Sequence, residues 1–317
     1  MIDCAFLPVF YERHKSLKEG NGSPVPAGYT QTEAVWLDMY GLGRFETYQF
    51  IYADCTGITH LQDWMIRTKG EPQIKASVAA FREWQQQTER AGDPIGVERK
   101  LLSDEQLLHW QEQGYIRVGG LVEEALCDAV TDFICGFLAV DLADPSTWYK
   151  GHADWHGLML QQYQHESMHR VRTHPNVRQL FAELYNTYAI IPQTDKGSFN
   201  PPETEDWKFV HHLLHWDMNY SKPDPTYIQG LIYLNDVPEN RGPLKVVPGF
   251  HKQFDNWQQK YPDEIESYHQ MRTTLEPEYI AGKKGDVVLW LQTLPHAASC
   301  NHSDLPRFVQ YLSFNRL

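Results

Sequence analysis

Residues 209–217 read FVHHLLHWD, and this stretch opens the part of the chain that decides the fold. It is rich in aromatic and apolar residues of the kind that favour extended strands. Side chains in a strand alternate between its two faces, so residues two apart lie on the same face. His215 and Asp217 have this spacing. The pattern predicts that an imidazole and a carboxylate point to one side, where they can bind one metal ion together.

The pattern His-x-Asp is not unique to this stretch. It recurs at residues 152–154, before the strand-rich region, and at 302–304, with only thirteen residues after it. His215 and Asp217 instead stand where the strand-like runs begin, which favours them as the pair that carries chemistry. His211 shares the predicted face of His215, and a supporting role and no role at all are equally consistent with its position.

Four further runs downstream have the composition of strands. They are short, rich in β-branched and aromatic residues, and bounded by proline, glycine, asparagine or aspartate. The runs are YIQGLIYL at 227–234, LKVVPG at 244–249, GDVVLWL at 285–291 and FVQYLSF at 308–314. They predict a mainly β protein of the α+β class, in which helices precede an antiparallel sandwich or jelly roll.

Helical patterns precede these runs. In LLSDEQLLHWQEQG, residues 101–114, Ser103 is an N-cap signal, acidic residues fill the first turn and Gly114 is a stop signal. A second helix is expected over residues 123–137. A third begins at Pro175, because proline is favoured in the first turn of a helix.

The first 95 residues are expected to form a helical region of their own. Helical spacing recurs in three segments, at 31–41, 44–54 and 58–70. Three short helices bury only a thin core, so we expect region 1–95 to pack on the domain formed by residues 96–317. The polar stretch 85–100 is the expected surface connector.

Composition narrows the choice of partners and location. The 317 residues include 41 acidic and 28 basic ones, and the formal charge of -13 disfavours nucleic-acid binding because phosphates require a basic face. Five cysteines without a Cys-x-x-Cys pair indicate neither a disulfide framework nor a zinc knuckle. The chain has no apolar run that spans a membrane and no secretory signal pattern, which predicts a cytoplasmic protein that does not bind membranes.

A third metal ligand is expected downstream of the first pair. His296 follows the strand-like run 285–291, and Arg307 follows His296 by eleven residues, a spacing that no other histidine in the chain shows. Two histidines and one carboxylate on one face of a metal are the ligand set of non-haem Fe(II) oxygenases, which keep other positions open. An arginine beside such a set offers a bidentate partner for the carboxylate of a co-substrate.

These motifs resemble the phytanoyl-CoA dioxygenase family. The resemblance rests on His215-x-Asp217, on NRGPLKVVPGFHK at 240–252, and on His296 and Arg307 with ten residues between them. It implies a double-stranded β-helix, which is a cupin-like jelly roll. It also implies that His215, Asp217 and His296 hold Fe(II) and that Arg307 anchors 2-oxoglutarate.

The resemblance covers about residues 101–317 and implies a reaction. Members use O2 to convert 2-oxoglutarate to succinate and carbon dioxide while they oxidise a C–H bond of a substrate, here expected to be a small molecule. Asp217 favours hydroxylation, because related halogenases carry a small residue in its place. Trp216 and Ala298 differ from the residues of some members, which makes Gln229 the candidate for a further 2-oxoglutarate contact.

Two other functions remain open from the residues alone. HESMH, residues 165–169, matches His-Glu-x-x-His, which on a helix places His165 and His169 as zinc ligands beside Glu166 as the base of a zinc hydrolase. The extended pattern with a third histidine six residues on is absent. The second alternative is a non-catalytic binding module on the same scaffold, since a fold does not fix a function.

Overall fold

The computed structural model describes residues 4–22, 24–87 and 96–317. It is a mixed α/β structure with antiparallel sheets and a group of helices near the N-terminus. The chain divides into two compact units. The first combines Met1–Val97 with Asn186–Asp195 and Phe314–Leu317, and the second comprises Glu98–Tyr185 and Lys196–Ser313.

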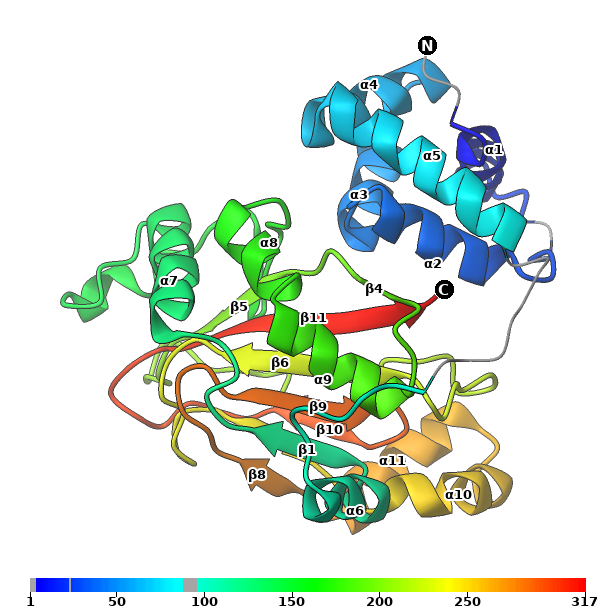
Figure 1. Ribbon diagram of the computed structural model, residues 1–317. Helices are drawn as coiled ribbons and strands as arrows, with labels where there is room; N and C mark the ends of the chain where they lie inside the picture. Colours follow the sequence, from blue (N-terminus) through cyan, green and yellow to red (C-terminus); the bar gives the residue numbers. More distant parts are fainter. Residues whose placement is uncertain (1–3, 23, 88–95) are drawn as a thin grey trace. The chain divides into compact units, whose positions relative to one another are not determined.

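Helices make up most of the first unit (Figure 1). They are α1 (Leu7–Lys18), α2 (Tyr29–Met39), α3 (Arg44–Ala53), α4 (Ile58–Lys69) and α5 (Glu71–Gln87). Large apolar side chains fill the core between them, including the fully buried Trp36 and Tyr40. The three segments predicted as helices are confirmed as α2, α3 and α4, whereas α1 and α5 have no counterpart among the predicted segments. Of the expected connector 85–100, residues 85–87 belong to α5 and 88–95 lie outside the described residues.

The first unit also contains two segments from later in the chain. β4 (Ile190–Pro192) pairs antiparallel with the last residues of β11 (Arg307–Arg316), and α2 contacts β4. Asn315 donates a 2.7 Å hydrogen bond to the carboxylate of Asp38 on α2. Burial raises the pKa of Asp38 well above its usual range, although the bond from Asn315 opposes the shift. The first unit is therefore built from three stretches of chain that are far apart in the sequence.

Deleting residues 1–95 is expected to yield insoluble or poorly folded protein. β4 and the end of β11 would lose the helices of their own unit, and the apolar surface that these helices cover would meet water at a cost of about 25 cal/mol per Å². Soluble yield and melting temperature, measured beside the full-length chain, check this expectation. A truncated chain that stays soluble and keeps the full-length melting temperature would contradict it.

Two antiparallel sheets form the frame of the second unit (Figure 1). The strand order of the larger is β1 (Tyr115–Val118), β9 (Val287–Leu291), β6 (Ile228–Tyr233), β11, β5 (Gly197–Asn200), β3 (Met159–Leu160) and β2 (Trp155–His156), with β4 attached to β11. The order of the smaller is β10 (His296–Ala298), β7 (Leu244–Val246) and β8 (Glu278–Ile280). The four strand-like runs downstream of residue 226 are confirmed as β6, β7, β9 and β11.

Residues 209–217 differ from the prediction, because they do not form a regular strand. Within them only His215 pairs, in an isolated antiparallel bridge to His296 at the start of β10. The apolar composition of the stretch has another cause, because Leu214 and Trp216 are buried in a core to which strands of both sheets contribute. The segment is held by side chains from other elements rather than by a strand ladder.

Helices and short 3-10 turns surround the two sheets. They are α6 (Asp104–Gln113), α7 (Glu124–Leu138), η2 (Pro145–Thr147), α8 (Glu166–Arg172), α9 (Pro175–Tyr185), η3 (Phe250–Gln253), α10 (Phe254–Lys260) and α11 (Glu264–Thr274). The predicted start of α6 is confirmed, because Ser103 Oγ accepts a hydrogen bond from Gln106 N while the Gln106 side chain accepts one from Ser103 N. Gly114 ends the helix with φ 74°, a left-handed conformation that suits glycine.

Helices α8 and α9 run over strands of the larger sheet (Figure 1), and each is hydrogen-bonded to one of these strands. Gln310 of β11 donates to the Met168 carbonyl of α8, and Ile228 N of β6 donates to the Tyr185 hydroxyl of α9. Glu183 of α9 accepts bonds from the three successive N–H groups of residues 100–102, which fixes the entry to α6. No helix in the described part of the chain is long and apolar enough to cross a membrane.

Candidate functional site

The two histidines predicted as metal ligands are joined through their backbones. His215 N donates to the His296 carbonyl at 3.0 Å, and His296 N donates to the His215 carbonyl at 3.1 Å. Their imidazole rings consequently lie on the same side, with centroids 4.8 Å apart. A bridge between residues 81 positions apart thus replaces the strand pairing expected around His215.

Each imidazole is also oriented by a bond from its Nδ1 atom. His215 Nδ1 lies 3.0 Å from the Leu213 carbonyl, and His296 Nδ1 lies 3.0 Å from the Leu294 carbonyl. A carbonyl oxygen can only accept, so both Nδ1 atoms carry the hydrogen and both Nε2 atoms have a free lone pair when the rings are neutral. Metal-bound histidines have this arrangement, since their second nitrogen nearly always donates to a carbonyl or carboxylate.

Asp217 completes the group of three. One carboxylate oxygen lies 3.2 Å from His296 Nε2, and the other lies 3.7 Å from His215 Nε2. Burial works to raise the pKa of Asp217, but the hydrogen bond from His296, and the positive charge that His296 and His215 carry when they are protonated in the absence of a metal, outweigh it and hold this pKa below its usual range. Gln229 of β6 donates to the carboxylate at 3.1 Å, which fixes its orientation.

The three side chains can hold a divalent cation. One ligand atom from each lies within 4.8 Å of the other two. Burial and the neighbouring His296 lower the pKa of His215, which favours the neutral, metal-binding form of its imidazole. The His296 side chain is only 4% exposed, whereas those of His215 and Asp217 are 35% and 56% exposed. Solvent therefore reaches the site from the side of His215 and Asp217 and not from the side of His296. This donor set matches the two-histidine, one-carboxylate pattern of non-haem iron.

Arg307 is a buried cation with no counterion among the residues that the structure describes. Its residue is 1% exposed, and it donates to the Gly242 carbonyl at 2.8 Å and to Ser198 Oγ at 3.2 Å. Its Nε atom is buried and has no partner, and no carboxylate of the described residues lies within ion-pair distance of its guanidinium. A buried charge of this kind is costly unless an anion pairs with it. The surroundings fit the binding of a carboxylate-bearing co-substrate.

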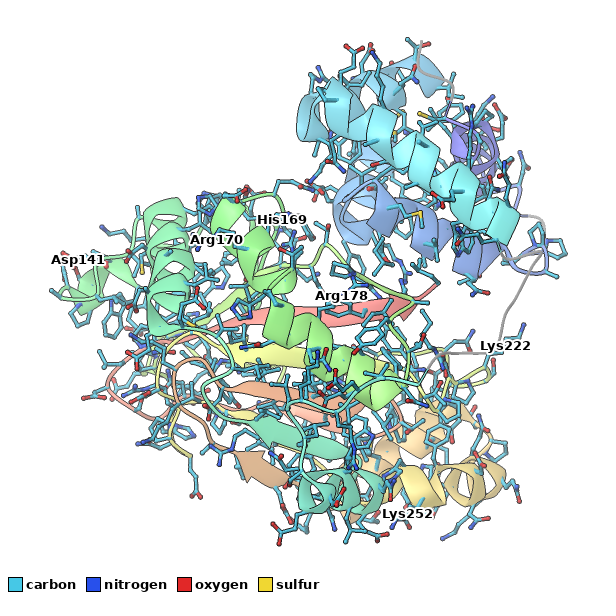
Figure 2. All side chains as sticks on the ribbon, viewed as in Figure 1. Asp141, His169, Arg170, Arg178, Lys222 and Lys252 are labelled. Atoms are coloured by element: carbon cyan, nitrogen blue, oxygen red, sulfur yellow. The ribbon has the colours of Figure 1, made fainter. Side chains whose placement is uncertain are left out.

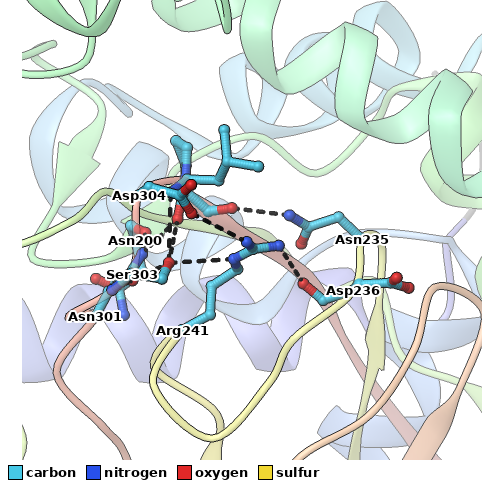
Figure 3. Close-up of polar contacts among 9 residues, drawn as sticks. Asn200, Asn235, Asp236, Arg241, Asn301, Ser303 and Asp304 are labelled. Atoms are coloured by element: carbon cyan, nitrogen blue, oxygen red, sulfur yellow. Dashed lines mark hydrogen bonds and ion pairs between the residues drawn. The ribbon is translucent and has the colours of Figure 1, made fainter.

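The loop between His296 and Arg307 is held by a polar network (Figure 3). Arg241 donates to Ser303 Oγ and to the Asp236 carbonyl, and Asn235 donates to the Pro306 carbonyl. Asn301 Nδ2 donates to the Asn200 carbonyl of β5 at 2.9 Å. These bonds hold the loop that joins His296 to Arg307 on two sides.

The residues of the His-Glu-x-x-His pattern do not gather into a site. Helix α8 begins at Glu166, so His165 precedes the helix as its N-cap, with its ring stacked on Phe133 at 3.8 Å. His169 lies on the exposed side of α8 next to Arg170 (Figure 2). The groups of metal-binding side chains found among the described residues do not include this pattern. The structure therefore gives the zinc-hydrolase alternative no ligand set.

A second group of potential ligands comprises Glu203, Cys300 and His302. Burial and Glu203 raise the pKa of the Cys300 thiol to about 11, which keeps it protonated. Lys208 lies 3.6 Å from the Glu203 carboxylate and partly neutralises it. Both effects oppose metal binding, so this group is a weaker candidate than the first.

The histidines at 211 and 212 have different surroundings from His215 and His296. His212 Nδ1 lies 3.0 Å from the Phe209 carbonyl, and the His211 ring lies 3.5 Å from the position that a side chain on Gly157 would take. Neither belongs to the cluster of His215 and its partners. The contacts of Arg307 with Ser198 and Gly242 could not be predicted from the sequence, because neither residue belongs to a recognisable motif.

Most of the chain matches one known protein family. Residues 110–309 match the family model described as Phytanoyl-CoA dioxygenase (PhyH). A Dictyostelium discoideum protein that bears the phytanoyl-CoA dioxygenase name is 24% identical over 255 residues, which cover 64% of this chain and 72% of that protein. The family match includes His215, Asp217, His296 and Arg307.

Solved structures share the fold at low sequence identity. The epimerase SnoN from nogalamycin biosynthesis has a TM-score of 0.51 and 18% identity, with 67% of this chain and 82% of that chain covered. The carbocyclase SnoK of the same biosynthesis has a TM-score of 0.51 and 19% identity, with 70% and 87% covered. EctD from S. alaskensis, solved with 2-oxoglutarate and 5-hydroxyectoine, has a TM-score of 0.50 and 18% identity, with 71% and 81% covered.

Proposed function

The chain belongs to the phytanoyl-CoA dioxygenase family of Fe(II)- and 2-oxoglutarate-dependent oxygenases, and from that premise we propose that it hydroxylates a C–H bond of a small molecule at an iron centre held by His215, Asp217 and His296. Its cofactors are Fe(II), 2-oxoglutarate and O2. O2 is the oxidant of the reaction: at the bound iron one of its oxygen atoms would go to 2-oxoglutarate, which becomes succinate and carbon dioxide, and the other to the substrate C–H bond, which becomes C–OH. The chain's own residues provide binding, orientation and a protected site.

One observation carries the proposal: three potential ligand atoms lie close together, and the two imidazoles that supply two of them are already oriented by hydrogen bonds. The Nδ1 atoms of His215 and His296 donate to carbonyl groups, so their Nε2 lone pairs point at the same place as the Asp217 carboxylate. Gln229 restrains that carboxylate through a 3.1 Å bond. These contacts preorganise the ligands, which lowers the cost of binding the metal.

Arg307 is proposed as the anchor of 2-oxoglutarate. Its guanidinium is always protonated and presents a planar fork that matches a carboxylate. A dicarboxylate whose far end reaches Arg307 would supply the anion that its buried charge lacks in the described residues. Gln229 is the proposed further contact for the co-substrate, through its side-chain NH2 group, which donates one hydrogen to Asp217 and has a second hydrogen to donate to a co-substrate oxygen.

The second unit is proposed as a double-stranded β-helix, in which the larger and smaller sheets face each other across the site. The antiparallel pairing throughout both sheets supports this, as does the bridge between His215 and the smaller sheet. The family's fold and the likeness to SnoN and EctD point the same way. In this proposal residues 96–317 are the catalytic domain, and residues 1–95 contribute no ligand to iron or 2-oxoglutarate.

The substrate is proposed to be a small metabolite. SnoN was solved with nogalamycin RO and EctD with 5-hydroxyectoine, which are both small molecules. The retained carboxylate of Asp217 favours hydroxylation, because it occupies the position that a halide would need.

Succinate formation from 2-oxoglutarate, measured against pools of metabolites, tests this function and its rivals together. We expect turnover with Fe(II) that rises when a pool contains the substrate, and none when Zn(II) replaces Fe(II). Iron binding without succinate formation in any pool would favour a non-catalytic module. Hydrolysis supported by Zn(II) would favour the hydrolase instead.

A further inference from the structure

The segment that carries His215 and Asp217 has to satisfy its backbone without a neighbouring strand on one edge. In extended chain, the backbone groups of alternate residues face opposite edges. His215 faces β10, where its N–H and carbonyl both pair with His296. Leu214 and Trp216 therefore present their carbonyls to the other edge. Both residues are buried, and a buried carbonyl without a partner is costly.

Helix α11 takes the place of the missing strand. Arg272 Nε donates to the Leu214 carbonyl at 2.9 Å, and the Tyr268 hydroxyl donates to the Trp216 carbonyl at 3.0 Å. The two donors are four residues apart, so they lie on one face of the helix. They contact the residues directly before and after His215.

Four successive carbonyl groups of the segment, at residues 213–216, each accept a hydrogen bond. The Leu213 carbonyl lies 3.0 Å from His215 Nδ1, and that of His215 accepts from His296 N. The carbonyls of Leu214 and Trp216 accept from α11. The carbonyls of residues 213 and 215 thus bond to the two histidines, and those of residues 214 and 216 bond to α11. Helix α11 therefore restrains the peptide groups that orient the side chains of His215 and Asp217.

The two donors on α11 also fix each other. The Arg272 guanidinium carbon lies 5.0 Å from the centre of the Tyr268 ring, and this ring meets the Trp216 ring edge-on at 5.5 Å. Burial raises the pKa of Tyr268, so its hydroxyl stays protonated and remains a donor.

We infer that Tyr268 and Arg272 are positioning residues of the metal centre, which hold the segment 213–217 in the geometry that lets His215 and Asp217 bind one ion with His296. The inference rests on the proposed function, because it concerns the same three ligands. It adds that a helix inserted between β7 and β8, far from the ligands in sequence, sets the metal affinity of the site. Neither residue is expected to touch the metal.

Calorimetric titration of the metal-free full-length chain with Co(II) tests this, with the visible spectrum of bound Co(II) as the measure of ligand geometry. Tyr268→Phe removes one hydroxyl and is expected to weaken Co(II) binding about tenfold and to shift the spectrum, as loss of a supporting bond commonly does. Arg272→Met is expected to have an effect of similar size. Arg272→Lys keeps the charge and one donor and should recover part of the loss.

Matched controls separate positioning from general stability. Tyr279→Phe on β8 and Arg67→Met on α4 make the same chemical changes at exposed positions and should leave affinity and spectrum unchanged. The melting temperature of each metal-free variant is measured as well. A Tyr268→Phe chain that melts lower but binds Co(II) as tightly as the wild type, with the same spectrum, would overturn the inference.

The same titration tests the proposed ligand set and the positioning role of α11 separately. If wild-type chain binds Co(II) and His296→Ala does not, the proposed ligands stand, and equal binding by Tyr268→Phe sinks only the role of α11. If wild type and His296→Ala bind alike, the proposed centre itself fails and α11 has no centre to position.

Discussion

His296→Ala is expected to reduce turnover of 2-oxoglutarate by roughly a thousandfold or more, because loss of a ligand removes several kcal/mol of metal-centred stabilisation. His296 is the most buried of the three ligands, and its backbone pairs with His215. The alanine variant keeps that backbone bridge and loses only the imidazole. Succinate release under saturating Fe(II) is the measurement.

His269→Ala is the matched control for this variant. His269 lies on α11 and is exposed, so its loss should leave turnover within a factor of two of the wild type. Circular dichroism and melting temperature establish that both variants fold. Near-normal succinate release by a folded His296→Ala chain would remove His296 from the ligand set.

Arg307→Met is expected to raise the KM for 2-oxoglutarate about a hundredfold and to change the KM for the prime substrate little. Truncating one partner of a buried, hydrogen-bonded charge pair costs about 2–5 kcal/mol, and a hundredfold change lies within that range. Methionine retains the apolar part of the side chain, so packing around β11 is largely kept. Initial rates at varied 2-oxoglutarate concentrations give the two constants.

The stability of the Arg307→Met variant gives a second readout. The wild-type guanidinium is buried with no carboxylate from the described residues, so its removal relieves a desolvated charge. Its removal also takes the donors from the Gly242 carbonyl and Ser198 Oγ, and because the two effects oppose each other the melting temperature of the ligand-free chain is expected to change little. Added 2-oxoglutarate should raise the melting temperature of the wild type but not that of the variant. An equal rise in both, with an unchanged KM, would mean that the dicarboxylate is held elsewhere.

Spacing rules and the family resemblance together could predict which residues meet at the site, although residues 209–217 do not form the regular strand that the spacing rule assumed. His215 and Asp217 are two apart in an apolar stretch, and His296 follows a strand-like run that the structure confirms as β9. The capping residues of α6 and the β-branched composition of β6 and β11 are equally local signals, and these elements form where they were expected.

The same rules could not predict how the site is held together. The stretch at 209–217 has strand composition, but its apolar residues serve the core and its carbonyls pair with side chains, which no periodicity reveals. The bonds from Tyr268 and Arg272 join residues more than 50 positions apart. The His-Glu-x-x-His pattern failed for a local reason, since α8 begins one residue too late to place His165 on its face.

The number of Fe(II) ions bound per chain under anaerobic conditions tests whether His215, Asp217 and His296 form the metal centre. We expect one ion for the wild-type chain. We expect none, at the same free concentration, for a chain in which His215, Asp217 and His296 are all replaced by alanine and the fold is retained. One ion still bound by that folded triple variant would contradict this assignment, because iron would then be held by other residues.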